Sequence, residues 1–122
     1  MIYITGDCHN NFERFNTRNF PEQKEMTKDD YVIICGDFGG VWNKDGESKM
    51  ETSALDWLDG KAFTTLFVDG NHENFDRLYA YPVEKKIWQT ARFKKWFFGH
   101  YHDNRNVTKD ELLLWEQIIR IS

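Results

Sequence analysis

All four histidines of this 122-residue chain follow directly after stretches that the sequence predicts to be strands. Two carboxylates, Asp7 and Asp37, and one amide, Asn71, also follow directly after predicted strands. Carboxylate oxygens, an amide oxygen and imidazole nitrogens together suit Mn²⁺, Fe or Zn²⁺ better than Ca²⁺ or an ion that prefers thiolates. The set therefore predicts a site for a divalent metal or a phosphate. Its members are Asp7, His9, Asp37, Asn71, His72, His100 and His102.

The spacing within this set favours a pair of ions. Asp7 and His9 are two residues apart, so both side chains leave the same side of an extended segment. The same holds for His100 and His102. Asp37 has two oxygens and can bridge two cations, and cations about 4 Å apart can bind a phosphoryl group and activate water. Each segment alone can also be a helix cap, a plain turn or a chance pair, but the four together favour a functional site.

Four short apolar segments must bring these side chains together. Residues 2–5, 31–35, 63–68 and 95–98 are predicted strands, and each is followed by a glycine and then polar residues. Residues 31–35 show no polar alternation, as is typical of a strand covered on both faces of a parallel sheet. Strands that alternate with helices predict an α/β fold with right-handed crossovers, in which all four turns emerge along one edge of the sheet.

Three helices are expected between these strands, because apolar residues recur there at helical spacing. The tail at residues 112–121 is ambiguous between helix and strand, and its isoleucines favour strand. The expected helices run from Asn10 or Asn11 to Pro21, over about residues 48–59 to a stop at Gly60, and from about Phe75 to Pro82.

Composition and charge narrow the class of protein. A hydrophobic fraction of 40% with 16% aromatic residues predicts a single globular domain over residues 1–122. The net charge of −4 argues against a general nucleic-acid binder. No segment resembles a signal peptide or reaches the ~20 apolar residues that span a bilayer, so a cytoplasmic protein is expected. Cys8 and Cys35 are interpreted as small buried side chains.

Taken in series, four motifs resemble those of the calcineurin-like metallophosphoesterase superfamily. They are Gly-Asp-x-His at residues 6–9, Gly-Asp-Phe-Gly-Gly at 36–40, Gly-Asn-His-Glu at 70–73 and Gly-His-x-His at 99–102. The resemblance runs over residues 2–121. It implies a sandwich of two β-sheets flanked by helices, with a dinuclear metal centre at one edge. It also implies hydrolysis of phosphomonoesters or phosphodiesters by a metal-activated hydroxide.

The resemblance assigns a role to each polar side chain of the set. One or two divalent ions per chain are expected, with Mn²⁺ favoured and Fe or Zn²⁺ as alternatives, and a phosphorylated substrate of unidentified chemistry. His72 is expected to act as a general acid or to stabilise phosphoryl charge. The first metal would be bound by Asp7, His9 and His102, the second by Asn71 and His100, and both by Asp37.

The chain departs from the family pattern between His72 and His100. Family members usually carry another metal-binding histidine in this interval, and here there is none. The interval is also short, which predicts an internal deletion around residues 82–95 and a fold truncated relative to the usual two-sheet αββα sandwich. We therefore expect an occupied first metal site and a weak or empty second one, unless water or a carboxylate such as Glu73 replaces the lost nitrogen.

The expected deletion leaves two alternatives for function. The first is a metal-dependent phosphoester hydrolase, either a phosphatase or a phosphodiesterase. The second is a catalytically impaired relic of the family that serves as a binding or interaction module. A truncated sandwich also exposes a sheet face and a strand edge, so a homo-oligomer is expected.

Overall fold

The computed structural model describes residues 1–81, 96–98, 104–108 and 111–122. Within these ranges it is a small α/β fold with two sheets. The first sheet has the strand order β3-β2-β1-β7 and the second has the order β4-β6-β5. The first sheet consists of β1 (Ile2–Thr5), β2 (Tyr31–Cys35), β3 (Thr64–Val68) and β7 (Ile118–Arg120), and the second of β4 (Trp96–Phe98), β5 (Arg105–Asn106) and β6 (Glu111–Leu113).

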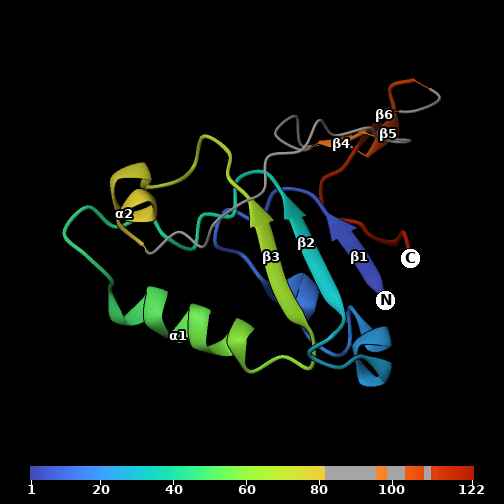
Figure 1. Cartoon of the computed structure of the whole chain (residues 1–122), viewed down its shortest axis with the longest axis horizontal. Coiled ribbons are helices and arrows are strands. Elements are labelled where there is room, and N and C mark those ends of the chain that lie inside the picture. The colour runs from blue at the N-terminus through green and yellow to red at the C-terminus, as the bar shows by residue number, and fades with distance from the viewer. Residues whose placement is uncertain (82–95, 99–103, 109–110) are drawn as a thin grey trace.

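The strands β1, β2 and β3 form the predicted parallel sheet. Tyr3 pairs with Val32, and Ile33 pairs with Leu66, so the three strands run in register from one end of the sheet to the other. Figure 1 shows the three arrows side by side with their heads at the same edge. The first three polar motifs follow those ends, which confirms their predicted convergence. The tail is β-structured as expected, but it is divided into β6 and β7.

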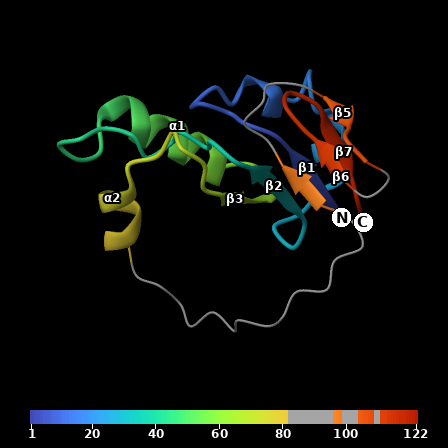
Figure 2. The same ribbon diagram turned by 90° about the horizontal axis from the view of Figure 1, so that it is seen from above.

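The prediction that the fourth strand lies in this parallel sheet is wrong. β4 belongs to the second sheet, where it pairs in parallel with β6. One edge of the first sheet, beside β1, is taken by β7, which pairs antiparallel with β1 through Ile4 and Ile119, and β4 pairs its backbone groups with β6 instead. Figure 2 shows α1 and α2 at the β3 end of the molecule and the second sheet near β1 and β7. The fourth turn, which carries His100 and His102, lies outside the described residues.

The second and third expected helices are confirmed. Helix α1 spans Lys49–Asp59, and the Ser48 side chain caps it by accepting the N–H of Glu51. Helix α2 spans Phe75–Ala80 and is capped in the same way by Asn74. Neither helix, nor any other in the described part of the chain, has the length and apolar character needed to cross a membrane.

The first expected helix, from Asn10 or Asn11 to Pro21, is wrong. The segment holds only two short 3₁₀ helices, η1 (Glu13–Phe15) and η2 (Pro21–Glu25). Between them, Asn16 Oδ1 accepts the N–H of Asn19 at 2.8 Å, and such local side-chain bonds compete with helix formation. Pro21 therefore begins η2 rather than ending a helix, because proline is tolerated in a first turn.

Phenylalanines fill the core against one face of the first sheet. Phe15 and Phe63 are completely buried and Phe20 is 2% exposed. The Phe63 ring lies 6.1 Å from the ring of Phe15 and 5.8 Å from that of Phe20, and all three pack with the buried Val32 and Ile34. Five phenylalanines of the described residues are thus buried in the core, and they anchor the segment that follows the first polar motif.

Replacing Phe15 by alanine tests this core. The cavity should lower the free energy of unfolding by about 3–5 kcal/mol, measured by urea denaturation. Tyr79→Ala is the matched control, because that ring is 74% exposed and its loss should change stability by less than about 0.5 kcal/mol. Equal losses in the two variants would contradict the packing described.

Candidate metal centre

Asp37 is the centre of the site and lies in the turn directly after β2. Its backbone is left-handed (φ 34°), as is that of Gly36 (φ 96°), a conformation uncommon for a residue with a side chain. The Asp37 carbonyl accepts the N–H of Cys8 at 3.0 Å and the N–H of His9 at 2.9 Å. The turn after β2 is thereby bonded to the turn after β1, and the first two polar motifs lie together.

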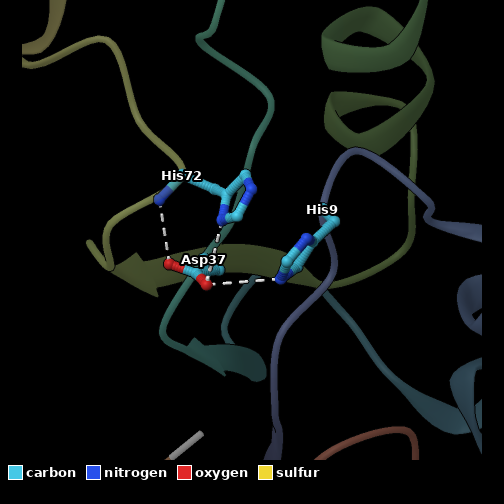
Figure 3. Close-up of side chains that lie close together, drawn as sticks. All are labelled: His9, Asp37 and His72. Atoms are coloured by element: carbon cyan, nitrogen blue, oxygen red, sulfur yellow. Dashed lines mark hydrogen bonds and ion pairs between the residues drawn. The ribbon is translucent and has the colours of Figure 1, made fainter. Parts of the chain in front are cut away.

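Two imidazoles converge on the Asp37 carboxylate (Figure 3). His9 Nε2 lies 3.2 Å from Asp37 Oδ2, and His72 Nδ1 lies 3.4 Å from the same oxygen. The backbone N–H of His72 donates to Asp37 Oδ1 at 3.0 Å. The two imidazole rings are 4.3 Å apart between centroids. The three side chains offer ligand atoms that all lie within 4.8 Å of one another, which makes a candidate metal site.

Asp7 adjoins this group, whereas Asn71 is more exposed. Asp7 is 1% exposed, and its Oδ2 lies 3.7 Å from His9 Nε2. The two are close because His9 is left-handed (φ 49°), not because the segment is extended, as the spacing argument assumed. Asn71 is exposed and donates its backbone N–H toward the Asp37 carboxylate. His100 and His102 are outside the described residues, so their assignment as ligands stays a prediction.

Asp37 stays ionised although it is buried. Burial by itself raises the pKa of this carboxyl, but the backbone N–H groups of His72 and Asn71 favour the charged form, and the two imidazoles add to this. The net result is a pKa below the ordinary aspartate value. A buried carboxylate that keeps its charge attracts a cation into the space that its neighbours share.

The residues present fit a divalent cation. Ligand bonds of about 2.1 Å place two ligand atoms about 3.0 Å apart in an octahedron and about 3.4 Å apart in a tetrahedron. The separations of 3.2 and 3.4 Å from Asp37 Oδ2 fall in this interval. In addition, His72 Nδ1 is buried and makes no hydrogen bond within the described structure, so its lone pair is available to a metal. Mixed oxygen and nitrogen ligands suit Mn²⁺, Fe and Zn²⁺.

Two glycines let the loops approach Asp37 and His9 closely. A Cβ at Gly70 would lie 1.9 Å from Asp37 Oδ1, and one at Gly39 would lie 2.9 Å from His9 Cα. Gly39 is also left-handed (φ 69°). The glycines of the second and third motifs are therefore required because backbone packs directly against the groups of the site.

Glu73 supports the site rather than offering a replacement ligand. Both of its carboxylate oxygens lie 3.2 Å from the Gly39 nitrogen and accept its N–H, and the side chain is buried. Burial raises the pKa of Glu73, and the backbone N–H groups around it offset this only in part. Glu73 thus bonds the third motif to the second. Its position in the Gly-Asn-His-Glu motif was the sequence signal for this residue.

Another buried carboxylate, Glu51, holds the loop that follows the second motif. Its Oε1 accepts the N–H groups of Trp42 and Asn43, both at 2.7 Å, and its Oε2 accepts from Arg77 at 2.8 Å. The Trp42 ring stacks on the His72 ring at 5.5 Å between centroids. Sequence reasoning missed four of these residues, because no local pattern marks a tryptophan in a loop or a glutamate in a helix as part of a site. The four are Trp42, Asn43, Glu51 and Arg77.

Arg14 holds the loop of the first motif through hydrogen bonds to backbone carbonyls. Its guanidinium donates to the carbonyl of Asp7 at 2.7 Å and to the carbonyl of Trp115 at 2.6 Å. The tail of the chain is thereby bonded to the loop that carries Asp7. Sequence reasoning missed this contact as well, because it joins residues that are 101 positions apart.

Neither cysteine belongs to the group of His9, Asp37 and His72 that offers converging ligand atoms. Burial raises the pKa of Cys8 to about 12 and that of Cys35 to about 11, so both stay protonated thiols at neutral pH. Both are free, Cys8 buried and Cys35 half-buried. This agrees with the interpretation of both as small packing residues.

Fold and site agree with the comparison to known families: residues 1–119 match the calcineurin-like phosphoesterases, and the chain belongs to this family. The family's members use divalent metals. The chain is also 31% identical over 94 residues to lariat debranching enzyme A of Xenopus laevis. That match covers 66% of this chain but 17% of the relative, so the chain spans a small part of that protein's length. No solved structure matches. The internal deletion stays a prediction.

The Glu51 contacts predict a pH-dependent stability. Burial raises the Glu51 pKa, but the N–H groups of Asn43 and Trp42 and the Arg77 guanidinium outweigh it, so the pKa is below the ordinary 4.5. A lowered carboxyl pKa stabilises the fold above the unfolded-state value, and this stabilisation is lost as pH falls through the folded-state value.

Glu51→Gln should therefore lower the free energy of unfolding by about 2 kcal/mol at neutral pH. The gap between this variant and the wild-type chain should shrink as pH falls below about 4.5, measured by urea denaturation. Glu47→Gln, at an exposed position, is the control and should follow the wild-type chain. A gap that grows on acidification would contradict the assignment.

Proposed function

We propose that this chain is a metal-dependent phosphoester hydrolase, a phosphatase or a phosphodiesterase. The observation that supports it best is the buried, ionised Asp37 carboxylate with the imidazoles of His9 and His72 within 3.4 Å of one of its oxygens. Divalent ions bound there, Mn²⁺ above all, would polarise the phosphoryl group and activate water. Membership of the phosphoesterase family supports the same reaction class.

The proposed ligands divide into two groups. Asp7, His9 and Asp37 are buried or half-buried, and the described contacts bring them together. Asn71, His100 and His102 are proposed to complete the coordination, with His102 at the first site and the other two at the second. One or two ions per chain are proposed, the first bound firmly and the second weakly or not at all.

His72 is proposed as the residue that acts on the substrate. Its side chain is 46% exposed, so one edge of the ring reaches solvent while Nδ1 faces Asp37. From this position the ring can give a proton to the leaving oxygen or stabilise phosphoryl charge. The same position of Nδ1 makes His72 a possible ligand, and the metal content of a His72 variant distinguishes the two roles.

Two variants test the proposed hydrolase. With Mn²⁺ present, we expect Asp37→Asn to abolish hydrolysis of p-nitrophenyl phosphate and bis(p-nitrophenyl) phosphate. His72→Ala should lower the rate by about 100-fold or more while the bound metal stays. Asp45→Asn, on the exposed loop before α1, is the matched control and should retain wild-type rates.

The same assay decides against the alternative of a relic that serves as an interaction module. Wild-type rates in both site variants would refute the proposed assignment. A wild-type chain that binds metal but hydrolyses neither ester would favour the relic.

Self-association also stays a proposal. Leu66 and Val68 on β3 are 45% and 56% exposed, and within the described structure β3 is the outer strand of its sheet. Such an edge is a template for pairing with a second copy of the chain. Light scattering at micromolar concentration should give at least a dimer, and a clean monomer would refute the proposal.

A further inference from the structure

A cavity of about 340 Å³ opens beside the two imidazoles of the site. Its volume lies in the range of small-ligand sites, about 300–1,000 Å³. Its walls combine rings, a flexible apolar side chain and amides. A molecule in this cavity would lie directly against the groups at Asp37. The lining residues include His9, Asn10, Trp42, Asn43, Met50 and His72.

Trp42 is exposed and yet firmly held. The residue is 53% exposed, a large apolar area to leave facing water. Its backbone is fixed by the buried carboxylate of Glu51, and the neighbouring Asn43 carbonyl accepts from the Asn74 side chain at 2.9 Å and from Arg77 at 2.9 Å. An aromatic ring held at a site by its backbone contacts is suited to binding, because little conformational entropy is lost when a ligand stacks on it.

The polar groups of the cavity indicate the kind of ring that fits. Asn10 Oδ1 is buried and accepts no hydrogen bond in the described structure, so it lacks a donor that a ligand can supply. The described residues that line the cavity include no lysine or arginine, which disfavours a second phosphate. A flat, neutral ring with N–H donors on its edge satisfies both observations. A nucleobase has this chemistry, whereas phenol has a smaller ring with a single donor and a sugar lacks the flat face.

We propose that the cavity at Trp42 binds the nucleobase of a nucleoside phosphoester whose phosphate lies at Asp37. The base stacks on the indole of Trp42, against the flexible side chain of Met50, and donates a hydrogen bond to Asn10. The placement of the phosphate rests on the proposed function. The binding of the base does not, because it is argued from Trp42, Met50 and Asn10, none of which is a proposed metal ligand. His9 and His72 line the wall of the same cavity.

The test measures binding of a nucleoside without phosphate. Adenosine, ribose and phenol are titrated into the full chain without metal, and the indole N–H signals of the five tryptophans are followed by NMR. Trp42→Phe identifies the Trp42 signal by its loss. We expect adenosine to shift that signal and to bind about tenfold more tightly than ribose or phenol.

Three variants make the test specific to this ring. Trp42→Ala should weaken adenosine binding about tenfold, whereas Trp42→Phe should retain it within about threefold, because a phenyl ring still stacks. Trp57→Ala is the matched control and should bind as the wild-type chain does. Trp57, on α1, is also an exposed tryptophan, at 41%, but the Lys61 ammonium lies over its ring and it does not line the cavity.

Several outcomes would overturn the inference. These are no binding of adenosine, equal binding to the Trp42→Ala variant, or equal affinity for phenol or ribose. Hydrolysis of adenosine monophosphate and of ribose 5-phosphate separates this inference from the proposed function. If the chain hydrolyses these esters but does not bind adenosine, the proposed hydrolase stands and the base site is refuted. If the chain binds adenosine but hydrolyses no ester, the base site stands and the proposed hydrolase is refuted.

Discussion

The site depends on the hydrogen bonds that converge on Asp37. Its carbonyl accepts two N–H groups from the turn after β1, and its carboxylate accepts the N–H of His72 from the turn after β3. Because these groups are buried, leaving one unpaired would destabilise the fold by about 1–3 kcal/mol. A single residue thus joins three loops that the parallel sheet delivers to one edge. The left-handed backbone at Asp37 is maintained by these bonds.

This arrangement also determines the chemistry. Oδ1 of Asp37 is occupied by a backbone donor, while Oδ2 faces the imidazoles of His9 and His72. The Asp37 carboxylate is therefore charged at a buried position, where the imidazoles of His9 and His72 offer further ligand atoms for a cation. The glycine at position 70 is part of the same constraint, because any side chain there would overlap the Asp37 carboxylate. The turn conformation, the hydrogen bonds between the loops and the ligand chemistry all involve Asp37.

Much of this was predictable from local patterns. The apolar runs at β1, β2 and β3, each followed by glycine and polar residues, predicted both the parallel sheet and the central position of Asp37. The predictions that failed depended on contacts between residues far apart in the sequence or on side-chain hydrogen bonds. The pairing of β7 with β1, which takes one edge of the first sheet, joins the two ends of the chain. The Asn16 side chain interrupts the first helix. Glu51 resembles an ordinary surface residue until the fold buries it.

The most direct test of this account is the metal content of the chain. Wild-type protein and Asp37→Asn, purified without added metal and reconstituted with Mn²⁺, are compared by inductively coupled plasma mass spectrometry. If Asp37 organises the centre, the wild-type chain holds one Mn²⁺ firmly and the variant loses it while remaining folded by circular dichroism. A wild-type chain without bound metal, or a folded variant with the same content, would contradict the central position given to Asp37.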